Sequence, residues 1–239
     1  MKGIILAGGA GRRLYPLTRV TNKHLLPVGR VPMIIHPIRR LVESGIKNIM
    51  IITGIEHMGD MINLLGSGSE YGCEFTYRVQ DSCSGVAGAL SLCRNFVGDD
   101  GCVVHLGDNI FENPVAKYIQ DFQTSEKGCM VLFKKVEDPR RFGVPTFIEG
   151  EIIEIEEKPE NPKSNYANVG LYMYDSKVFD VIDSLSPSNR GEYEITDVNN
   201  SYILNNDSIY GVINGWWSDA GTFESLNNAN NLSISEKNE

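Results

Sequence analysis

A short segment rich in glycine and arginine follows the first apolar run of the chain. Its sequence, LAGGAGRRLYP (6–16), holds three glycines and two arginines: Gly8, Gly9, Gly11, Arg12 and Arg13. Glycines let the backbone approach a ligand and present N–H groups to phosphate oxygens. Guanidinium groups beside them bind phosphate through paired hydrogen bonds, so the pattern favours a polyphosphate site over a plain strand-to-loop turn.

The segment matches neither of two well-known phosphate-binding loops. It lacks the G-K-[ST] ending of the P-loop, and its G-G-x-G-x-R spacing lacks the third glycine of the dinucleotide fingerprint. Both of those nucleotide-binding classes are therefore excluded. Lys23, in TNKHLLPV, adds a further cation after the arginines.

Two aspartates are candidates to hold a metal ion beside such phosphates. Asp108 ends a predicted buried strand in LGDN, and Asp219 stands far away in sequence, in WWSDAGT. In α/β proteins, ligands lie at the carboxyl ends of parallel strands. Either aspartate alone fits a turn or a helix N-cap equally well, so the residue types leave both interpretations open.

Three further polar side chains end predicted strands. Gln80 ends CEFTYRVQ, and its amide offers the donor and acceptor that thymine or uracil requires, although a polar strand end is the simpler interpretation. Glu157 and Lys158 end EIIEIEEKP, where strand neighbours point to opposite faces and a solvated charged edge is common. A twist at Pro159 would bring both side chains to one pocket.

Strands and helices alternate in the first part of the chain. We expect strands at 2–7, 48–53, 73–80, 102–107 and 129–136, a helix between Pro32 and Gly45, and helices at 85–96 and 114–123. This order predicts an α/β fold with a Rossmann-like, doubly wound and mostly parallel sheet.

The pattern changes near residue 143. VPTFI and EIIEIEE, joined by Glu149-Gly150, predict an antiparallel hairpin, and YANVGLYMY adds a strand. Helices follow near 176–185 and 194–205, and a last helix from Thr222 becomes polar and frays. No repeat or linker divides the chain, so we predict a single domain, 1–239.

Composition and charge exclude several classes of protein. The net charge of −9 argues against nucleic acid as a partner, and no apolar run approaches the ~20 residues that a membrane span requires. The N-terminal apolar stretch is too short for a signal peptide. Five cysteines without a C-x-x-C pair argue against disulfides and zinc and favour a reducing, cytoplasmic location.

Several motifs together resemble the sugar-nucleotide pyrophosphorylases, especially the glucose-1-phosphate thymidylyltransferases. GGAGRRLYPLTRVTNKHLLPVG (8–29) is similar to that family's G-G-x-G-[TS]-R-L-x-P and K-x-L-L-P signature. Further matches run nearly end to end and in the same order: LGDNIF (106–111), RFGV (141–144), EEKP (156–159), SNYA (164–167), RGEYEITD (190–197) and WWSDAGT (216–222).

The resemblance implies transfer of a nucleotidyl group from dTTP to glucose-1-phosphate, giving dTDP-glucose and pyrophosphate by in-line displacement. Its catalytic residues would be Arg13 and Lys23, and Asp108 and Asp219 would hold one Mg²⁺. The expected contacts to the nucleotide are Leu6, Gly8, Gly9, Gly11, His24, Gln80 and Gly85. The expected contacts to the sugar phosphate are Asn109, Gly143, Glu157, Lys158 and Val169.

The family's fold is that of the nucleotide-diphospho-sugar transferases. It implies a nucleotide-binding half at about 1–135, and a half at 136–239 with the antiparallel sugar-binding insertion and the C-terminal helix. The family usually forms homo-oligomers, dimers or tetramers. The chain ends soon after the last shared helix, so it resembles the short class without the tail that helps to build a regulatory nucleotide site.

Four positions depart from the family pattern. Arg12 replaces Thr or Ser, His24 replaces a common Gln, and Gly88 replaces a Gln after the base-contacting segment. The sugar strand usually reads Y-A-V-T-G, whereas Asn168 and Val169 occupy its third and fourth positions here. Sugar identity and the choice of dTTP over UTP stay open, because one methyl group is worth only ~1–3 kcal/mol. A more distant alternative is a non-catalytic sugar-nucleotide sensor.

Overall fold

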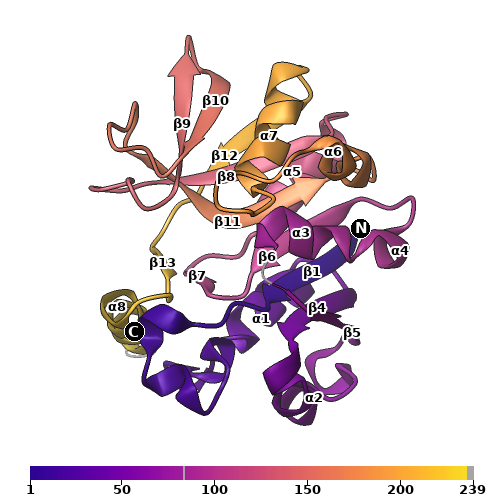
Figure 1. Ribbon diagram of the computed structural model, residues 1–239, viewed down its shortest axis with the longest axis vertical. Coiled ribbons are helices and arrows are strands. Elements are labelled where there is room, and N and C mark those ends of the chain that lie inside the picture. Colours follow the sequence, from indigo (N-terminus) through magenta and orange to yellow (C-terminus); the bar gives the residue numbers. More distant parts are fainter. Residues whose placement is uncertain (83, 236–239) are drawn as a thin grey trace. The chain divides into compact units, whose positions relative to one another are not determined.

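A computed structural model describes residues 1–82 and 84–235 (Figure 1). The chain forms two compact units, which we call the first and the second unit. The first unit comprises Lys2–Cys83, His105–Lys117 and Gly215–Glu239. The second unit comprises Met1, Ser84–Val104 and Tyr118–Asn214. Each unit is therefore built from segments that are distant in sequence.

Parallel strands form the centre of the first unit. β4 (Asn48–Gly54) pairs in parallel with β1 (Lys2–Ala7) on one side and with β5 (Glu74–Gln80) on the other. Five of the six β1 residues are buried, as expected for a parallel strand covered on both faces. β6 (Cys102–Leu106) passes from the second unit into the first, where the Gly107 N–H donates to the Leu6 carbonyl at 2.9 Å. The predicted strands at 2–7, 48–53, 73–80 and 102–107 are confirmed.

The helix expected after Pro32 is also confirmed. α1 (Ile35–Glu43) buries Ile35, Ile38 and Leu41, and Pro37 lies in its first turn, where no intrahelical N–H partner is lost. Gly45 follows the helix with φ +81°, the left-handed conformation of a helix C-cap. The first unit also contains α2 (Met58–Leu65), which the sequence pattern did not predict, and α8 (Phe223–Ser235).

Short elements complete the first unit. They are η1 (Arg12–Leu14), η2 (Leu17–Arg19), η3 (Lys23–Leu25), η4 (Ile55–His57), η5 (Ser69–Tyr71), β2 (Pro27–Val28), β3 (Val31–Pro32), β7 (Asn109–Phe111) and β13 (Trp217–Asp219). The residues 236–239, where we expected fraying, lie outside the described part of the chain.

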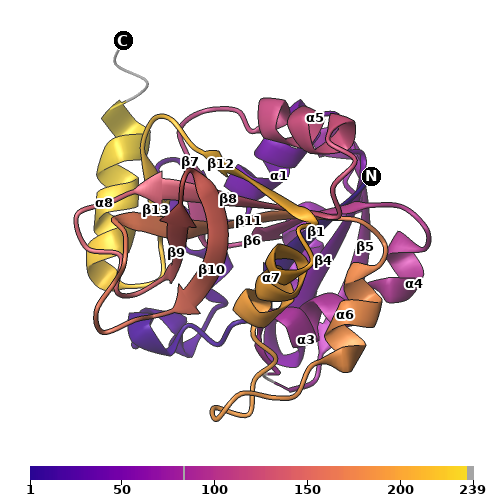
Figure 2. The same ribbon diagram turned by 90° about the horizontal axis from the view of Figure 1, so that it is seen from above.

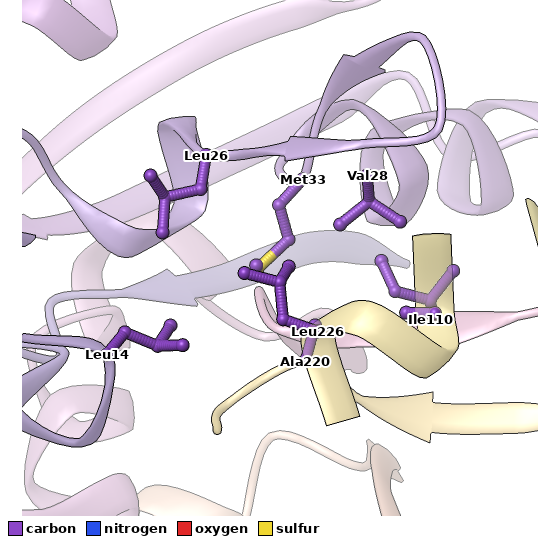
Figure 3. Close-up of a cluster of buried hydrophobic side chains, with 8 residues drawn as sticks. Leu14, Leu26, Val28, Met33, Ile110, Ala220 and Leu226 are labelled. Atoms are coloured by element: carbon purple, nitrogen blue, oxygen red, sulfur yellow. The ribbon is translucent and has the colours of Figure 1, made fainter. Parts of the chain in front are cut away.

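A buried cluster holds these short elements together (Figure 3). It joins side chains from η1, the β2–β3 region, β7 and α8: Leu14, Leu26, Val28, Met33, Ile110, Ala220, Leu226 and Ala229. Leu14 directly follows Arg12 and Arg13, and Ala220 directly follows Asp219. The apolar cluster therefore fixes the backbone directly after Arg13 and directly after Asp219, two of the charged residues that the sequence singled out.

The second unit combines parallel and antiparallel strands (Figure 2). β8 (Cys129–Lys135) pairs antiparallel with β11 (Tyr166–Tyr174) and in parallel with β12 (Ser208–Val212). β9 (Gly143–Ile148) and β10 (Glu151–Glu157) form the predicted hairpin. Its turn has φ +51° at Glu149 and φ +87° at Gly150, which suits a two-residue turn with both residues left-handed.

Helices α3 (Gly85–Ser91), α4 (Arg94–Val97), α6 (Val178–Ser184) and α7 (Ile195–Leu204) belong to the second unit, and α5 (Ala116–Thr124) enters it from the first. The single helix expected at 85–96 is wrong, because the chain tightens between α3 and α4. The Cys93 N–H donates to the Leu90 carbonyl, three residues back, at 2.9 Å. The other helices agree with the prediction.

Two absences concern the described part of the chain. None of its helices is both long and apolar enough to cross a membrane. Four cysteines, Cys73, Cys93, Cys102 and Cys129, are free thiols. Together, the parallel strands, the helices and the antiparallel hairpin confirm the predicted α/β fold.

Candidate functional site

The glycine segment leaves β1 and lies against three side chains of the first unit. A Cβ on Gly8 would lie 2.7 Å from Oε1 of Gln80, and one on Gly9 would lie 3.4 Å from Cε of Lys23. Gly11 has φ +62°, and its carbonyl accepts a hydrogen bond from Thr18 Oγ1 at 2.9 Å. Gly11 requires glycine because of its left-handed φ, and the missing side chains of Gly8 and Gly9 let Gln80 and Lys23 lie against the backbone.

A pocket of about 270 Å³ opens beside this segment, and its lining residues all belong to the first unit. They are Gly8, Gly9, Ala10, Thr18, Asn22, Gly54, Ile55, Glu56, His57, Gln80, Asp81 and Ser82. The backbone of the glycines and the amide of Gln80 therefore share one concave site, with Ile55 as an exposed apolar side chain in its wall. Such a site offers phosphate-binding N–H groups and a base-reading amide together.

Lys23 and Asp108 form an ion pair at the side of this segment. Lys23 Nζ lies 2.5 Å from Asp108 Oδ2, and the two side chains are only 14% and 15% exposed. Asn109 Nδ2 donates to the other oxygen of Asp108 at 3.0 Å, while Trp217 Nε1 donates to Asn109 Oδ1 at 2.8 Å. Both oxygens of the Asp108 carboxylate thus accept hydrogen bonds, and its orientation is fixed.

The surroundings of Asp108 have opposing effects on its pKa. Burial raises the pKa, but the charge and the hydrogen bond of Lys23 outweigh burial, so the pKa of Asp108 lies well below its ordinary value. The carboxylate is ionised in the folded protein, as a metal ligand must be.

Asp219 is brought to Asp108 by two short strands. β13 pairs antiparallel with β7, with Asp219 opposite Asn109, and the Ala220 N–H donates to the Asp108 carbonyl at 2.7 Å. A Cβ on Gly221 would lie 3.1 Å from Arg13 Nη2 and 3.4 Å from Asp108 Oδ2. The guanidinium of Arg13 therefore lies close to Asp108, and the backbone pairing places Asp219 beside Asp108 in the first unit.

These two aspartates fit a hard divalent cation that also binds substrate oxygens. In residues 1–82 and 84–235, no three His, Cys, Asp or Glu side chains gather closely enough to form a metal site by themselves. Mg²⁺ typically uses one or two carboxylates and completes its shell with phosphate oxygens and water. The donor set suits that arrangement and not a closed structural metal site.

His24 is buried behind Asn22, next to the pocket of the first unit. It is 1% exposed, and its Nδ1 lies 2.7 Å from Asn22 Oδ1, which also accepts the His24 backbone N–H at 2.9 Å. Asn22 Nδ2 in turn donates to the Ala7 carbonyl at 3.2 Å. Burial lowers the pKa of His24 to about 3, so the ring is neutral. It is absent from the pocket lining, and Asn22, which the sequence did not single out, lines the pocket instead.

A second group of predicted residues lies in the second unit. Glu157 ends β10, and its two oxygens accept hydrogen bonds of 2.7 Å from Lys158 Nζ and from Thr196 Oγ1. Lys158 follows with φ +49°, and its N–H donates to the Phe142 carbonyl at 2.9 Å. This left-handed residue interrupts the alternation of the strand, so the ammonium of Lys158 reaches the carboxylate of Glu157.

Gly143 and Asn168 adjoin this pair. A Cβ on Gly143 would lie 3.5 Å from Glu157 Oε2 and 3.5 Å from Asn168 Cβ. The side chain of Val169 is fully buried, so any contact of Val169 with a sugar must come from its backbone. Thr196 and Arg190 also belong here, and both lie in the RGEYEITD motif.

The remaining predicted residues have clear positions. Leu6 is 9% exposed, and its carbonyl is bonded to Gly107. Gly85 begins α3 in the second unit with φ +83°, and a Cβ there would lie 2.5 Å from the Tyr193 carbonyl. Arg12 and Arg13 are both exposed, and Arg13 is the one beside Gly221.

The sequence profile of the nucleotidyl transferase family matches residues 2–236. A low-salt glycan biosynthesis nucleotidyltransferase of Haloferax volcanii is 39% identical over 239 residues, covering 99% of this chain and 67% of that protein. Glucose-1-phosphate thymidylyltransferases of Neisseria meningitidis and Xanthomonas campestris are 42% and 44% identical, over 96% and 97% of this chain and 81% and 80% of their own lengths.

Solved structures give the same picture. A Bacillus anthracis protein assigned as a glucose-1-phosphate thymidylyltransferase, crystallised with sucrose, is 57% identical with a TM-score of 0.95, covering 98% of this chain and 95% of its own. A UDP-glucose pyrophosphorylase complexed with UDP-glucose has a TM-score of 0.84 at 24% identity, over 98% of both chains, and supports the fold alone.

Proposed function

The chain belongs to the nucleotidyl transferase family and is an enzyme of sugar-1-phosphate nucleotidyl transfer, and from that premise we propose that it converts dTTP and glucose-1-phosphate into dTDP-glucose and pyrophosphate. The observation that carries the choice of a thymine-like or uracil-like base is the position of Gln80, and the choice of thymine follows the glucose-1-phosphate thymidylyltransferases that the chain resembles. The amide of Gln80 lies against Gly8 in the pocket of the first unit. An amide can pair with N3–H and O4 of thymine at once.

In this proposal the pocket of the first unit holds dTTP. The base lies at Gln80, and the backbone N–H groups of Gly8, Gly9 and Gly11 hold the phosphates. Arg13 stabilises the departing pyrophosphate through paired hydrogen bonds. Lys23, already positioned by Asp108, neutralises charge at the α-phosphate.

Sugar nucleotidyltransferases generally use a divalent metal ion, and we propose Mg²⁺ held by Asp108 and Asp219. When bound, it would supply positive charge to the phosphate oxygens, which favours attack by an anion. Asn109, which we predict to contact the sugar phosphate, also orients Asp108 in this site.

The second unit supplies the sugar site. Lys158 binds the phosphate of glucose-1-phosphate and directs its oxygen at the α-phosphorus, while Glu157 accepts hydrogen bonds from sugar hydroxyls. No protein base is required, because the attacking phosphate oxygen is already ionised. Positioning and electrostatic stabilisation account for the catalysis. We place this reaction in the cytoplasm, where the free thiols stay reduced, and propose that the enzyme acts as a dimer or tetramer.

The test is pyrophosphate release with glucose-1-phosphate and each of dTTP, UTP, CTP, GTP and ATP. The proposal requires dTTP to give the highest kcat/KM, and a preference for UTP would reassign the nucleotide while keeping the reaction class. Arg13→Ala should reduce kcat by orders of magnitude, whereas the matched Arg12→Thr should be tolerated. Release of no pyrophosphate with any nucleotide would instead favour a sensor.

A further inference from the structure

Asn22 is a largely buried polar residue between the end of β1 and the start of η3. It is 6% exposed, and it lines the pocket of the first unit together with Gly8 and Gly9. A polar side chain that is buried in this way requires hydrogen-bond partners. The partners of Asn22 show which parts of the pocket it joins.

Three hydrogen bonds hold the amide of Asn22. Nδ2 donates to the Ala7 carbonyl at 3.2 Å, while Oδ1 accepts from the His24 backbone N–H at 2.9 Å and from His24 Nδ1 at 2.7 Å. Because a carbonyl only accepts and a backbone N–H only donates, these partners allow one orientation of the amide. The ring of His24 is confined in turn, since a Cβ on Gly107 would lie 2.7 Å from its Cδ2. The side chain of Asn22 is therefore a rigid link.

The link joins the two segments that would hold the triphosphate. Ala7 ends β1 and directly precedes Gly8. The Ala7 carbonyl and the Gly8 N–H belong to one planar peptide unit, so fixing the carbonyl also fixes the direction of that N–H. At its other end, Asn22 is the N-cap of η3, whose first residue is Lys23. The amide thus sets the backbone of the glycine segment and that of Lys23 relative to each other.

The side chain of Lys23 lies where this link directs it. A Cβ on Gly9 would lie 3.4 Å from Cε and 3.5 Å from Nζ of Lys23, so the end of the lysine side chain lies against the glycine backbone. Asp108 holds the ammonium itself. Lys23 is therefore fixed at two points, at its backbone by Asn22 and at its charge by Asp108.

We propose that Asn22 is a positioning residue, which holds the glycine N–H groups and the ammonium of Lys23 in the arrangement that the triphosphate requires. The inference rests on the proposed function, since that function places the phosphates of dTTP at these groups. Asn22 acts through Gly8 and Lys23 and not on the reacting atoms. Loss of the link weakens the phosphate contacts and leaves the base contact at Gln80 intact.

A purely structural role for Asn22 gives a different expectation. Loss of the cap would then lower stability, while the folded protein would bind dTTP as before. If substitution changed the shape of the whole pocket, dTTP and thymidine, which has the base but no phosphate, would both bind more weakly and by the same factor. The positioning role requires that only the ligand with phosphates binds more weakly. The ratio of the two dissociation constants therefore distinguishes these roles.

The experiment measures the Kd of dTTP and of thymidine in the presence of Mg²⁺, together with the kinetics of pyrophosphate release. In Asn22→Ser the hydroxyl group can still cap η3, but the donor to Ala7 is lost. The Kd of dTTP should rise ~10-fold, as expected for one charge-assisted hydrogen bond. Misalignment of the phosphates should lower kcat by ~10- to 100-fold. The Kd of thymidine and the KM for glucose-1-phosphate should stay unchanged.

Asn230→Ser is the matched control. Asn230, in α8 of the same unit, also joins two elements through its amide, since Oδ1 accepts from the Gly29 N–H at 2.8 Å and Nδ2 donates to the Leu226 carbonyl at 3.0 Å. It does not line the pocket. The control should lose stability and keep all four constants.

Asn22→Thr covers the case in which the serine variant folds poorly, because threonine also caps a helix and has nearly the volume of asparagine. The proposal is overturned if either folded variant keeps the wild-type ratio of the two dissociation constants, whether both constants are unchanged or both have risen. Absence of pyrophosphate release by the wild-type protein with dTTP would instead contradict the proposed function. The two failures are therefore distinguishable.

Discussion

Lys23 and Asp108, which are 85 residues apart in the chain, are joined by a hydrogen bond of 2.5 Å in a largely buried position. The pair lies between the glycine segment and the end of β6. It holds the proposed catalytic cation and one proposed metal ligand together in the structure without substrate. Two predictions concern this pair directly.

Lys23→Met should destabilise the protein and inactivate it. Removing one member of a largely buried ion pair leaves Asp108 uncompensated, which costs roughly 3–5 kcal/mol for fully buried pairs and somewhat less here. Without Lys23, burial raises the pKa of Asp108. The free energy of unfolding that the variant loses relative to the wild-type protein should therefore be smaller at lower pH, where the carboxyl is protonated. Urea denaturation at pH 7.5 and 5.5 measures this. Equal stability of the variant and the wild-type protein would contradict the prediction.

Asp108→Asn and Asp219→Asn should each reduce kcat by orders of magnitude while the fold persists. Asp108 directly precedes β7, and Asp219 ends β13, which pairs with β7; the two residues supply the carboxylates of the proposed Mg²⁺ site. EDTA should abolish activity of the wild-type protein, and excess Mg²⁺ should restore it. Circular dichroism checks the fold, and full activity in EDTA or in either variant would contradict a site with one metal.

The sequence could predict the main elements because they depend on local patterns. The apolar runs of β1 and β4, the helix between Pro32 and Gly45, and the hairpin turn at Glu149-Gly150 follow from period, capping and turn chemistry. The sequence pattern did not predict the division between α3 and α4 or the helix α2, because short helices depend on packing more than on propensity.

The site could be predicted only in part. Motifs identified its residues, but the pairing of Asp219 with Asn109 depends on contacts that are remote in sequence. Strand alternation predicts opposite faces for Glu157 and Lys158, and the left-handed φ of Lys158, which overrides it, has no local signal. His24 was expected to line the nucleotide pocket, whereas its ring is buried and its Nδ1 is hydrogen-bonded to Asn22 Oδ1.

Gly8→Ala should raise the KM for dTTP with little effect on stability. The added Cβ would lie 2.7 Å from Oε1 of Gln80, so the amide must turn away from its base-reading position. Gly45→Ala is the control, because Gly45 has φ +81° and nothing lies within 4 Å of its added Cβ. The control should lose about 1 kcal/mol of stability and keep its KM. Kinetics and thermal denaturation on both variants test the pair, and an unchanged KM in Gly8→Ala would leave Gln80 without a role in binding.

Stability should fall as the pH is lowered below 6.5. Burial lowers the pKa of His24 to about 3 and that of His105 to about 4, whereas both are near 6.5 when unfolded. Between these values the unfolded chain binds more protons than the folded one, so stability rises with pH there. Each histidine contributes up to ~1.4 kcal/mol per pH unit. Denaturation midpoints from pH 4.5 to 7.5 measure the slope, and His24→Gln should reduce it. A slope unchanged in that variant would show that His24 is not buried and neutral.

The last prediction concerns Lys158, because it separates a sugar phosphate site from a charged strand end. Its ammonium lies 2.7 Å from Glu157 Oε1, and its side chain is 47% exposed, so the ion pair itself should contribute less than about 1 kcal/mol to stability. Lys158→Met keeps most of the side-chain volume and removes the charge. If Lys158 binds the phosphate of glucose-1-phosphate, this change should raise the KM for glucose-1-phosphate about 10- to 100-fold, the range of a charge-assisted hydrogen bond. The KM for dTTP should change little, and kcat should fall because the attacking oxygen is less well aimed.

Lys163→Met, at a second exposed lysine of the second unit that lies 3.8 Å from Glu154, is the matched control and should leave all three constants unchanged. Near-wild-type values for both substrates in Lys158→Met would mean that Lys158 is a solvated residue at the end of β10 and that the phosphate of the sugar binds elsewhere.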